Sequence, residues 1–369
     1  LFLGGSTGSI GRLLLNNGKG RLKEIPFTPA ISEAGCEDMG ALLFEANGDG
    51  NLDLYVVSGS VEAPPEHTRY KDRLYFGNGK GQFTKSQTQL IPNIYNSGSS
   101  ISACDFDRDG DLDLYIGGRS VPGKYPTTPK SVLLENDGSG KFNDITLKTS
   151  SSLSKSGLVT SSIWTDINGD DWQDLIITHE WGPVSVYLNK QGKLIETSFG
   201  KTKLTGWWNG IESLDIDNDG EDELVFGNAQ GFVHILEWDS ENNGWSDNFH
   251  TIDMGGAVKG MEIAQIDDDP QLEIAVGYNW VSDVGKVKII DGQTLLAETN
   301  WSSGVSWSHG QWTAGWPYGL AMGDLDGDDE AEIAMGDDRG FLWVVETNTP
   351  EIYVGRDITP DEAEWYLDI

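Results

Sequence analysis

Short apolar runs alternate with acidic, glycine-rich loops along this chain, without the 3.6-residue period of an amphipathic helix. Residues 54–57 form a run that follows one such loop, while the stretches 101–104 and 210–214 each precede another. Runs of this length bounded by Gly, Asp and Asn are typical of strands. The pattern therefore predicts pairs of antiparallel strands joined by an acidic loop.

A second kind of turn follows in the first half of the chain. Asn-Gly or Asp-Gly turns lie at residues 17–20, 78–81 and 137–140, each between apolar runs. Such turns are strong signals for hairpins. The sequence thus predicts repeats of four strands, A to D, with the acidic loop between strands A and B. The ninth residues of these loops recur every 49 to 61 positions, about the length of one propeller blade.

Six loops share one arrangement of oxygen-bearing side chains at positions 1, 3, 5 and 9, and we number them loop 1 to loop 6. Six copies in one register separate this pattern from ordinary acidic turns, which are common singly. The candidate metal ligands are Glu45, Asn47, Asp49 and Asp53; Asp105, Asp107, Asp109 and Asp113; Asp166, Asn168, Asp170 and Asp174; Asp215, Asp217, Asp219 and Glu223; Asp267, Asp269 and Glu273; and Asp324, Asp326, Asp328 and Glu332.

The residue types and their spacing suit calcium. Calcium takes six to eight oxygen ligands, whereas magnesium prefers a stricter octahedron that retains several waters. Carboxylates at positions 1, 3, 5 and 9 point to one centre, glycine at position 6 allows a sharp turn, and the carbonyl at position 7 adds a ligand. The sequence predicts about five or six bound Ca²⁺ ions. Solvated acidic turns are the alternative interpretation.

The six loops are unequal. Loop 2 combines four carboxylates with Gly110 and is predicted to bind calcium best. Loop 5 has Gln265 at its first position and Pro270 at its sixth, so it is predicted to bind calcium least well. Loops 1 to 3 end in Asp and loops 4 to 6 in Glu, a change near residue 220 that fits either divergent duplication or a composite chain.

The Asp-x-Asp-x-Asp-Gly-x-x-Asp motif resembles the FG-GAP/VCBS repeats, a family that includes the integrin α-subunit propellers. The resemblance covers nearly the whole chain. It implies a calcium-binding β-propeller that is extracellular or on the cell surface, with the periplasm as the alternative, and that acts in adhesion or ligand binding. Individual loops depart from the motif at Glu45, Asp171, Gln265, Pro270, Asp329 and the three terminal Glu residues.

The predicted fold is an all-β, seven-bladed β-propeller with four-stranded antiparallel blades, forming a single domain over residues 1–369. In this prediction a blade made of residues 1–34 and 357–369 closes the ring by pairing N- and C-terminal strands, which removes the open sheet edge. Six blades plus remnants is the alternative. The other predicted blades are residues 38–92, 98–153, 158–204, 208–255, 258–302 and 316–356.

Charge and aromatic residues point to the kind of partner. The net charge of −34 excludes a nucleic-acid partner, which requires a basic surface, and no apolar run is long enough to span a membrane. Aromatic side chains gather in the D–A and B–C connections, at the blade ends opposite the acidic loops. They favour a protein or glycan ligand of the cell surface or matrix, although rings packed between blades would give the same pattern. The candidates are Trp181, Trp207, Trp208, Trp280, Trp312, Trp316 and Tyr318.

Catalysis finds little support in the sequence, which contains five His residues and no recognisable nucleophile motif. Glu180 is a candidate general acid, so a carbohydrate-active enzyme, either a calcium-assisted polysaccharide lyase or a glycosidase, is the alternative to a binding scaffold. A structural subunit of a surface assembly is a further alternative. Cys36 and Cys104 are expected at opposite ends of their strands, too far apart for a disulfide.

Overall fold

The computed structural model describes residues 1–16, 22–27, 29, 34–87, 89–197, 205–216, 222–239, 244–264, 272–280, 284–292, 294–295, 317–323, 332–337, 342–345 and 352–354. Nearly all of the regular structure in these residues is antiparallel β-sheet. The helices described are single turns: α1 (Thr146–Thr149) and the 3₁₀ helices η2 (Thr68–Tyr70) and η3 (Leu153–Lys155). No helix of the described residues is long and apolar enough to cross a membrane.

The chain divides into two compact units, which we describe separately. Unit 1 contains residues 1–15 and 24–205, and unit 2 contains residues 16–23 and 206–369. Unit 1 contains three four-stranded blades. Blade 1 consists of β4 (Asp38–Phe44), β5 (Asp53–Ser58), β6 (Arg73–Gly77) and β7 (Phe83–Lys85); blade 2 of β8 (Ser97–Cys104), β9 (Asp113–Ser120), β10 (Val132–Asn136) and β11 (Phe142–Asp144); and blade 3 of β12 (Val159–Thr165), β13 (Asp174–His179), β15 (Ser185–Asn189) and β16 (Leu194–Thr197).

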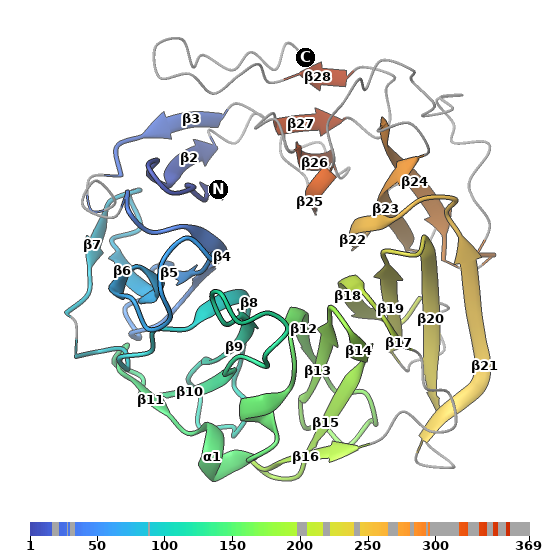
Figure 1. Ribbon diagram of the computed structural model, residues 1–369, viewed down its shortest axis with the longest axis horizontal. Coiled ribbons are helices and arrows are strands. Elements are labelled where there is room, and N and C mark those ends of the chain that lie inside the picture. Colours follow the sequence, from blue (N-terminus) through green and yellow to red (C-terminus); the bar gives the residue numbers. More distant parts are fainter. Residues whose placement is uncertain are drawn as a thin grey trace. The chain divides into compact units, whose positions relative to one another are not determined.

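Unit 2 contains three further blades, labelled with the rest in Figure 1. Blade 4 consists of β18 (Trp208–Leu214), β19 (Glu223–Asn228), β20 (Phe232–Asp239) and β21 (Gly244–Asp253); blade 5 of β22 (Val258–Ala264), β23 (Glu273–Trp280) and β24 (Val284–Asp291); and blade 6 of β25 (Pro317–Gly323), β26 (Glu332–Asp337), β27 (Leu342–Val345) and β28 (Ile352–Val354). Short strands β14 (Gly182–Pro183) and β17 (Thr205–Gly206) lie outside the blades.

The second strands of blades 1, 3 and 4 (β5, β13 and β19) are buried along their whole length. In β5 and β13 every residue is buried, because each strand lies between two neighbours of its own sheet and packs against an adjacent blade. Between blades 1 and 2 the packed side chains include Tyr55 and Leu114, and between blades 2 and 3 they include Tyr115 and Leu175. This packing fixes the second strand, and with it the acidic loop that precedes the strand.

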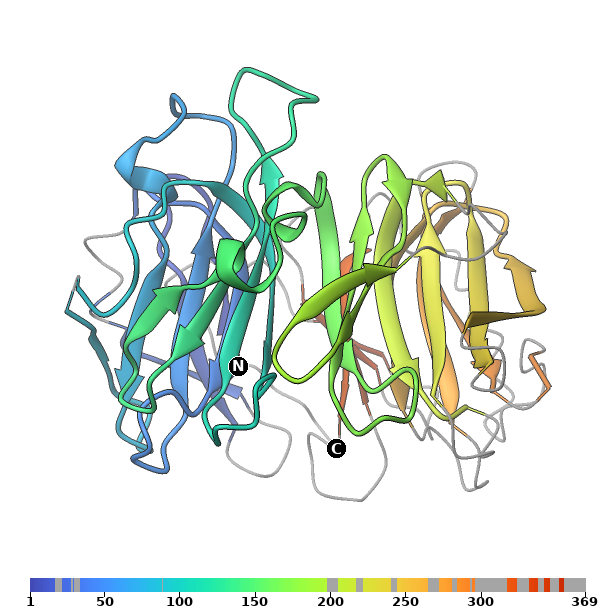
Figure 2. The same cartoon turned by 90° about the horizontal axis from the view of Figure 1, so that it is seen from below.

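Strand register places the ninth loop position at the start of the second strand in every blade. Phe44 pairs with Asp53, Cys104 with Asp113, and Thr165 with Asp174. The same pairing brings Leu214, Ala264 and Gly323 opposite Glu223, Glu273 and Glu332. The acidic loops and the long connections after the second strands therefore lie at opposite ends of a blade, as Figure 2 shows for β9.

The prediction of an all-β propeller is confirmed, but the prediction of seven blades is wrong, because the described residues form six. Six sheets of the described residues contain a strand pair joined by an acidic loop. The N-terminal sheet, with β1 (Phe2–Leu3), β2 (Arg12–Asn16) and β3 (Leu22–Ile25), has three strands and no such pair. It packs on blade 1 through Phe2 and Phe27. The strand predicted to complete it, in residues 357–369, lies outside the described residues.

The two cysteines lie at opposite ends of equivalent strands. Cys36 precedes β4, and Cys104 is the last residue of β8. Both are buried, and no disulfide joins them, which confirms the prediction made from the strand register.

Candidate metal loops and an aromatic cluster

The first residue of each described acidic loop folds the loop around its own carboxylate. In loop 2, Asp105 accepts hydrogen bonds from the backbone N–H groups of Asp109 at 3.0 Å and Gly110 at 3.1 Å. Asp166 accepts the matching bonds from positions 5 and 6 of loop 3, at 3.0 and 2.6 Å. Glu45 accepts one from position 6 of loop 1. The same turn is thus formed in loops 1 to 3.

Two positions in each of these loops have left-handed backbone. The sequence predicted a left-handed residue at position 6 only. Position 4 is also left-handed, and the glycine found there in loops 1 and 3 is the sequence feature that could have indicated it. L-residues with side chains adopt this conformation at a cost, so the two non-glycine cases are locally strained. The residues are Gly48 and Gly50 in loop 1, Arg108 and Gly110 in loop 2, and Gly169 and Asp171 in loop 3.

The ninth-position carboxylates of loops 1 to 3 are fully buried. Each accepts a hydrogen bond from the backbone at the end of the third strand of its blade. The pairs are Gly77 to Asp53 at 2.8 Å, Asn136 to Asp113 at 2.8 Å, and Asn189 to Asp174 at 2.6 Å. One oxygen of each carboxylate is therefore hydrogen-bonded to the sheet, and the other is available for contacts with the acidic loop.

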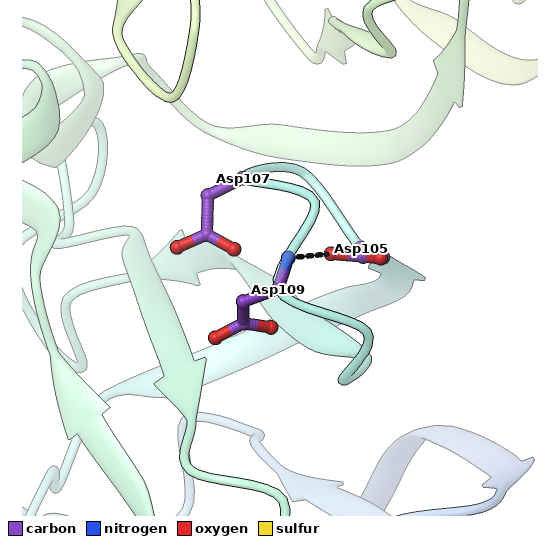
Figure 3. Close-up of side chains that lie close together, drawn as sticks. All are labelled: Asp105, Asp107 and Asp109. Atoms are coloured by element: carbon purple, nitrogen blue, oxygen red, sulfur yellow. Dashed lines mark hydrogen bonds between the residues drawn. The ribbon is translucent and has the colours of Figure 1, made fainter.

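Loop 2 gathers its carboxylates around one point. Oxygens of Asp105, Asp107 and Asp109 lie within 4.8 Å of one another (Figure 3), and no other group of three acids does so among the described residues. The Oδ2 atom of Asp113 and the Oδ1 atom of Asp107 are buried and accept no hydrogen bond there. Ligands on opposite sides of a calcium ion lie up to about 5 Å apart, so the spacing of the Asp105, Asp107 and Asp109 oxygens fits Ca²⁺.

The electrostatics of these carboxylates reflect burial and mutual repulsion. Burial, followed by repulsion from Asp107, Asp109 and Asp105, raises the pKa of Asp113 to about 8. Burial likewise raises the pKa of Asp174 to about 7, with Asp170 and Asp166 adding to the effect. A cation between the carboxylates would reverse the repulsion.

Loop 3 differs because a lysine contacts it. Lys190 lies in the turn after β15, and its Nζ atom is 2.7 Å from Asp170 Oδ2. Asn168 Nδ2 donates to Asp174 Oδ2 at 3.1 Å, so that oxygen also has a partner. Sequence reasoning missed Lys190, because its contact with the loop depends on how the β15–β16 turn folds back. The protein itself thus supplies one ammonium group and one neutral amide donor to the carboxylates of loop 3.

Asparagines also tie neighbouring blades to the loops. Asn136 of blade 2 donates from Nδ2 to the carbonyl of Ala46 at 2.9 Å, and Asn189 of blade 3 donates to the carbonyl of Phe106 at 2.7 Å. Ala46 and Phe106 are the second residues of loops 1 and 2. The sequence analysis did not single out these asparagines, although both directly precede the turn after the third strand.

Loops 4 to 6 are described only in part. Glu223 is buried, and its Oε2 accepts a hydrogen bond from the backbone of Ile216 at 2.8 Å, as Asp53 does from Ala46 in loop 1. Asp215, Glu273 and Glu332 lie at the predicted strand ends. The remaining predicted ligands of these loops, Asp217, Asp219, Asp267, Asp269, Asp324, Asp326 and Asp328, lie outside the described residues, as does Gln265.

Residues 45–116 and 166–226 match the FG-GAP-like repeat family. The chain contains FG-GAP-like repeats. The matched ranges include all of loops 1 to 4, the loops in which the buried ninth carboxylate accepts the bonds given above. No curated protein matches the sequence.

Solved structures share the fold of these FG-GAP-like repeats at low sequence identity. BBS1N, crystallised in complex with ARL6DN and soaked with lead, has a TM-score of 0.54 at 11% identity, over 94% of this chain and 91% of that chain. The computationally designed Ika8 protein has a TM-score of 0.50 at 14% identity, over 94% of this chain and 81% of that chain. These likenesses support the fold alone.

An aromatic cluster lies at the opposite end of two FG-GAP-like repeats, in the B–C connections of blades 2 and 3. Trp181 and Tyr125 are 59% and 58% exposed. The indole N–H of Trp181 donates to the Tyr125 hydroxyl, which donates to Glu180 Oε1 at 2.8 Å. Arg119 donates to the other oxygen of Glu180. The buried Glu180 therefore holds two exposed rings in fixed positions.

The contacts of Glu180 do not suit the catalytic role considered from sequence. A general acid needs an oxygen that reaches the substrate. Both oxygens of Glu180 accept hydrogen bonds from protein groups, and the residue is buried. Its neighbour His179 is also buried and donates from Nδ1 to the Pro183 carbonyl at 2.8 Å, while burial lowers its pKa.

The other aromatic residues predicted to contact a ligand differ in their burial and placement. Trp208 is 1% exposed and packs edge-on against Phe226 at 5.0 Å, so the ring belongs to the core of blade 4 and is not available to a ligand. Trp207 is half-buried. Trp280 and Tyr318 lie in β23 and β25, where only their backbone is described. Trp312 and Trp316 lie outside the described residues.

Proposed function

We propose that the protein is a calcium-stabilised binding scaffold. The observation that carries this proposal is loop 2, where three carboxylates converge and the buried Oδ2 of Asp113 accepts no hydrogen bond from the described residues. A buried carboxylate oxygen without a partner is costly, and a cation with oxygen ligands would compensate it. Asp105, Asp107, Asp109 and Asp113 would hold Ca²⁺ in loop 2.

The same backbone turn supports calcium in loops 1 and 3, with fewer charges. In loop 1, Glu45, Asn47, Asp49 and Asp53 would supply the ligands, and in loop 3 Asp166, Asn168, Asp170 and Asp174. The prediction of about five or six ions extends the proposal to the loops of unit 2. Exposed loops with few ligand charges suit the millimolar calcium of an extracellular or cell-surface setting, where calcium-binding modules have dissociation constants of about 10⁻⁴ to 10⁻³ M.

The proposed ligand site is the aromatic cluster formed by Arg119, Tyr125, Glu180 and Trp181. Two exposed rings held by hydrogen bonds lose little conformational freedom when a ligand binds them. Rings of this kind contact the apolar faces of sugars and of protein side chains. A protein or glycan of the cell surface or matrix is therefore the class of partner that we propose, with adhesion as the role.

Calcium removal tests the scaffold. Binding to the folded chain alone stabilises it by mass action, by about 2.7 kcal/mol for one site at a calcium concentration 100 times the dissociation constant. A chelator is expected to lower the melting temperature substantially, millimolar calcium to restore it, and the same concentration of magnesium to restore it less. A melting temperature that changes with neither chelator nor calcium would refute the proposal.

Ligand binding is tested with glycan and peptide arrays in calcium. Trp181→Ala is expected to weaken binding at least about tenfold, the range of a hot-spot residue. Tyr125→Phe keeps the ring but removes the hydroxyl that joins Trp181 to Glu180, so a smaller loss would show that ring placement contributes. Leu147→Ala, at another exposed apolar residue, is the control. Equal binding by wild type and Trp181→Ala would place the ligand site elsewhere.

A further inference from the structure

A cavity of about 150 Å³ opens at the end of blade 1 opposite acidic loop 1. Its walls come from the start of β6, the end of β7, the η2 turn and the segment before β4. All of these belong to unit 1. The cavity is separate from the aromatic cluster, with which it shares no residue.

The cavity is basic in a strongly acidic protein. The whole chain has 25 Lys and Arg residues against 59 Asp and Glu. The nine lining residues instead include three basic ones, Lys71, Arg73 and Lys85, and one acidic residue, Asp72. Side chains of this charge gathered around a concave site favour an anion.

The acidic residue in the lining is already engaged. Asp72 Oδ1 accepts from the backbone of Ser58 at 2.9 Å, and Oδ2 accepts from the Tyr55 hydroxyl at 3.3 Å. Neither donor belongs to the lining. Burial also raises the pKa of Asp72 to about 7, which reduces its negative charge near neutral pH. Asp72 therefore opposes an incoming anion weakly.

Arg73 supplies a buried donor that lacks an acceptor. Its Nη2 atom lies 2.6 Å from Asp38 Oδ1, and both side chains are almost fully buried. Its Nε atom is buried and has no hydrogen-bond partner among the described residues. The guanidinium keeps its positive charge at every working pH, so Arg73 remains a cationic residue in the wall of the cavity.

We propose that this cavity binds a small oxyanion, either a carboxylate or a phosphate or sulfate group. The guanidinium of Arg73 and the ammonium groups of Lys71 and Lys85 contribute positive charge around the anion. Lys71 has three N–H donors, of which Asn93 accepts one at 2.8 Å. The Thr68 and Ser86 hydroxyls, also in the lining, add neutral donors. The site requires neither the calcium loops nor the aromatic cluster.

The test uses Cys36, which lines the cavity, as the reporter. Alkylation of Cys36 is followed by mass spectrometry in constant 1 mM calcium, with sodium sulfate, sodium acetate or sodium chloride added at equal ionic strength. Cys104, buried at the acidic-loop end of β8, is the internal control. Sulfate protection of Cys36 beyond chloride indicates a phosphate or sulfate group, and acetate protection indicates a carboxylate. Equal rates in all three salts would overturn the proposal.

Two matched variants distinguish a specific anion site from a general electrostatic effect of the lysine charges. Lys85→Met removes a charge from the lining, and Lys80→Met removes one from an exposed lysine in the β6–β7 turn at the other end of the blade. Lys85→Met is expected to raise the anion concentration for half protection by about three- to fivefold, as for an exposed ion pair, and Lys80→Met to leave it unchanged. Equal shifts in both variants would show bulk screening and contradict the assignment. Because calcium is constant, this outcome does not depend on the scaffold proposal.

Discussion

Loops 2 and 3 belong to adjacent blades and share one backbone turn. They differ in which groups offset the negative charge of their carboxylates. In loop 2, Asp107 Oδ1 and Asp113 Oδ2 are buried and accept no hydrogen bond from the described residues. In loop 3, Lys190 contacts Asp170 and Asn168 donates to Asp174. In our proposal an external cation balances the carboxylates of loop 2, whereas loop 3 obtains part of that balance from its own blade.

This difference shows that counting carboxylates is an incomplete guide to metal affinity. A lysine that reaches an acidic loop stabilises the metal-free state and competes with the ion. Calcium must then displace the ammonium, which lowers the apparent affinity. Loop 2 is therefore expected to bind calcium more tightly than loop 3 for two reasons: one more ligand carboxylate and no competing lysine contact among the described residues.

The largest effect is expected from Asp107→Ala in loop 2. The variant removes a ligand, so it should lose about 2–3 kcal/mol of the stability that millimolar calcium confers. In excess chelator the same variant should be as stable as wild type or slightly more so, because one repelling charge is gone. Denaturant unfolding with calcium and with chelator measures both the calcium-dependent stability and the stability of the metal-free protein.

Asp111→Ala is the matched control, since Asp111 is a half-buried residue at position 7 of the same loop, where the backbone carbonyl is the expected ligand. It should keep the full calcium response. If Asp107→Ala and Asp111→Ala respond alike to calcium, the side chain of Asp107 is not a ligand.

A smaller effect is expected from Lys190→Met beside loop 3. Removing the ammonium should raise the calcium affinity of this loop by about threefold or more, and cost at most about 1 kcal/mol of stability in chelator, as for an exposed ion pair. Lys193→Met changes an exposed lysine of the same turn and serves as control. Unchanged affinity in Lys190→Met would mean that the lysine contact does not explain the difference between the loops.

The sequence predicted the strand pairs, the turn at position 6 and the placement of the ninth acid after the loop, because these depend on residues near one another in the chain. It missed the contact of Lys190 with Asp170 and the inter-blade bonds of Asn136, which arise from separate strands that fold together. The predicted seventh blade needed a strand from residues 357–369 to complete residues 1–34, and so short a stretch does not specify a blade. Likewise, composition could not tell the buried Trp208 from the exposed Trp181.

The smallest effect is expected from Asp171→Gly in loop 3. Asp171 has a φ of 66°, which glycine adopts without strain, whereas Gly110 occupies the same position in loop 2. The variant should change stability in chelator by less than about 1 kcal/mol, in the stabilising direction. Gly110→Ala is the reverse substitution, and a Cβ there meets no atom within 4 Å, so its expected destabilisation is due to the backbone alone. Thermal unfolding of both variants in chelator provides the measurement, and a destabilised Asp171→Gly would contradict the assignment of strain.

The central claim, that loop 2 is the best calcium site among the described loops, is tested most directly by the order in which the loops fill. Crystals equilibrated at increasing calcium concentration show the anomalous density of the ion at each loop separately. The account predicts that density in loop 2 appears at the lowest concentration, with Asp113 Oδ2 among the ligands, and that loop 3 fills later. Density in loop 3 before loop 2 would contradict it.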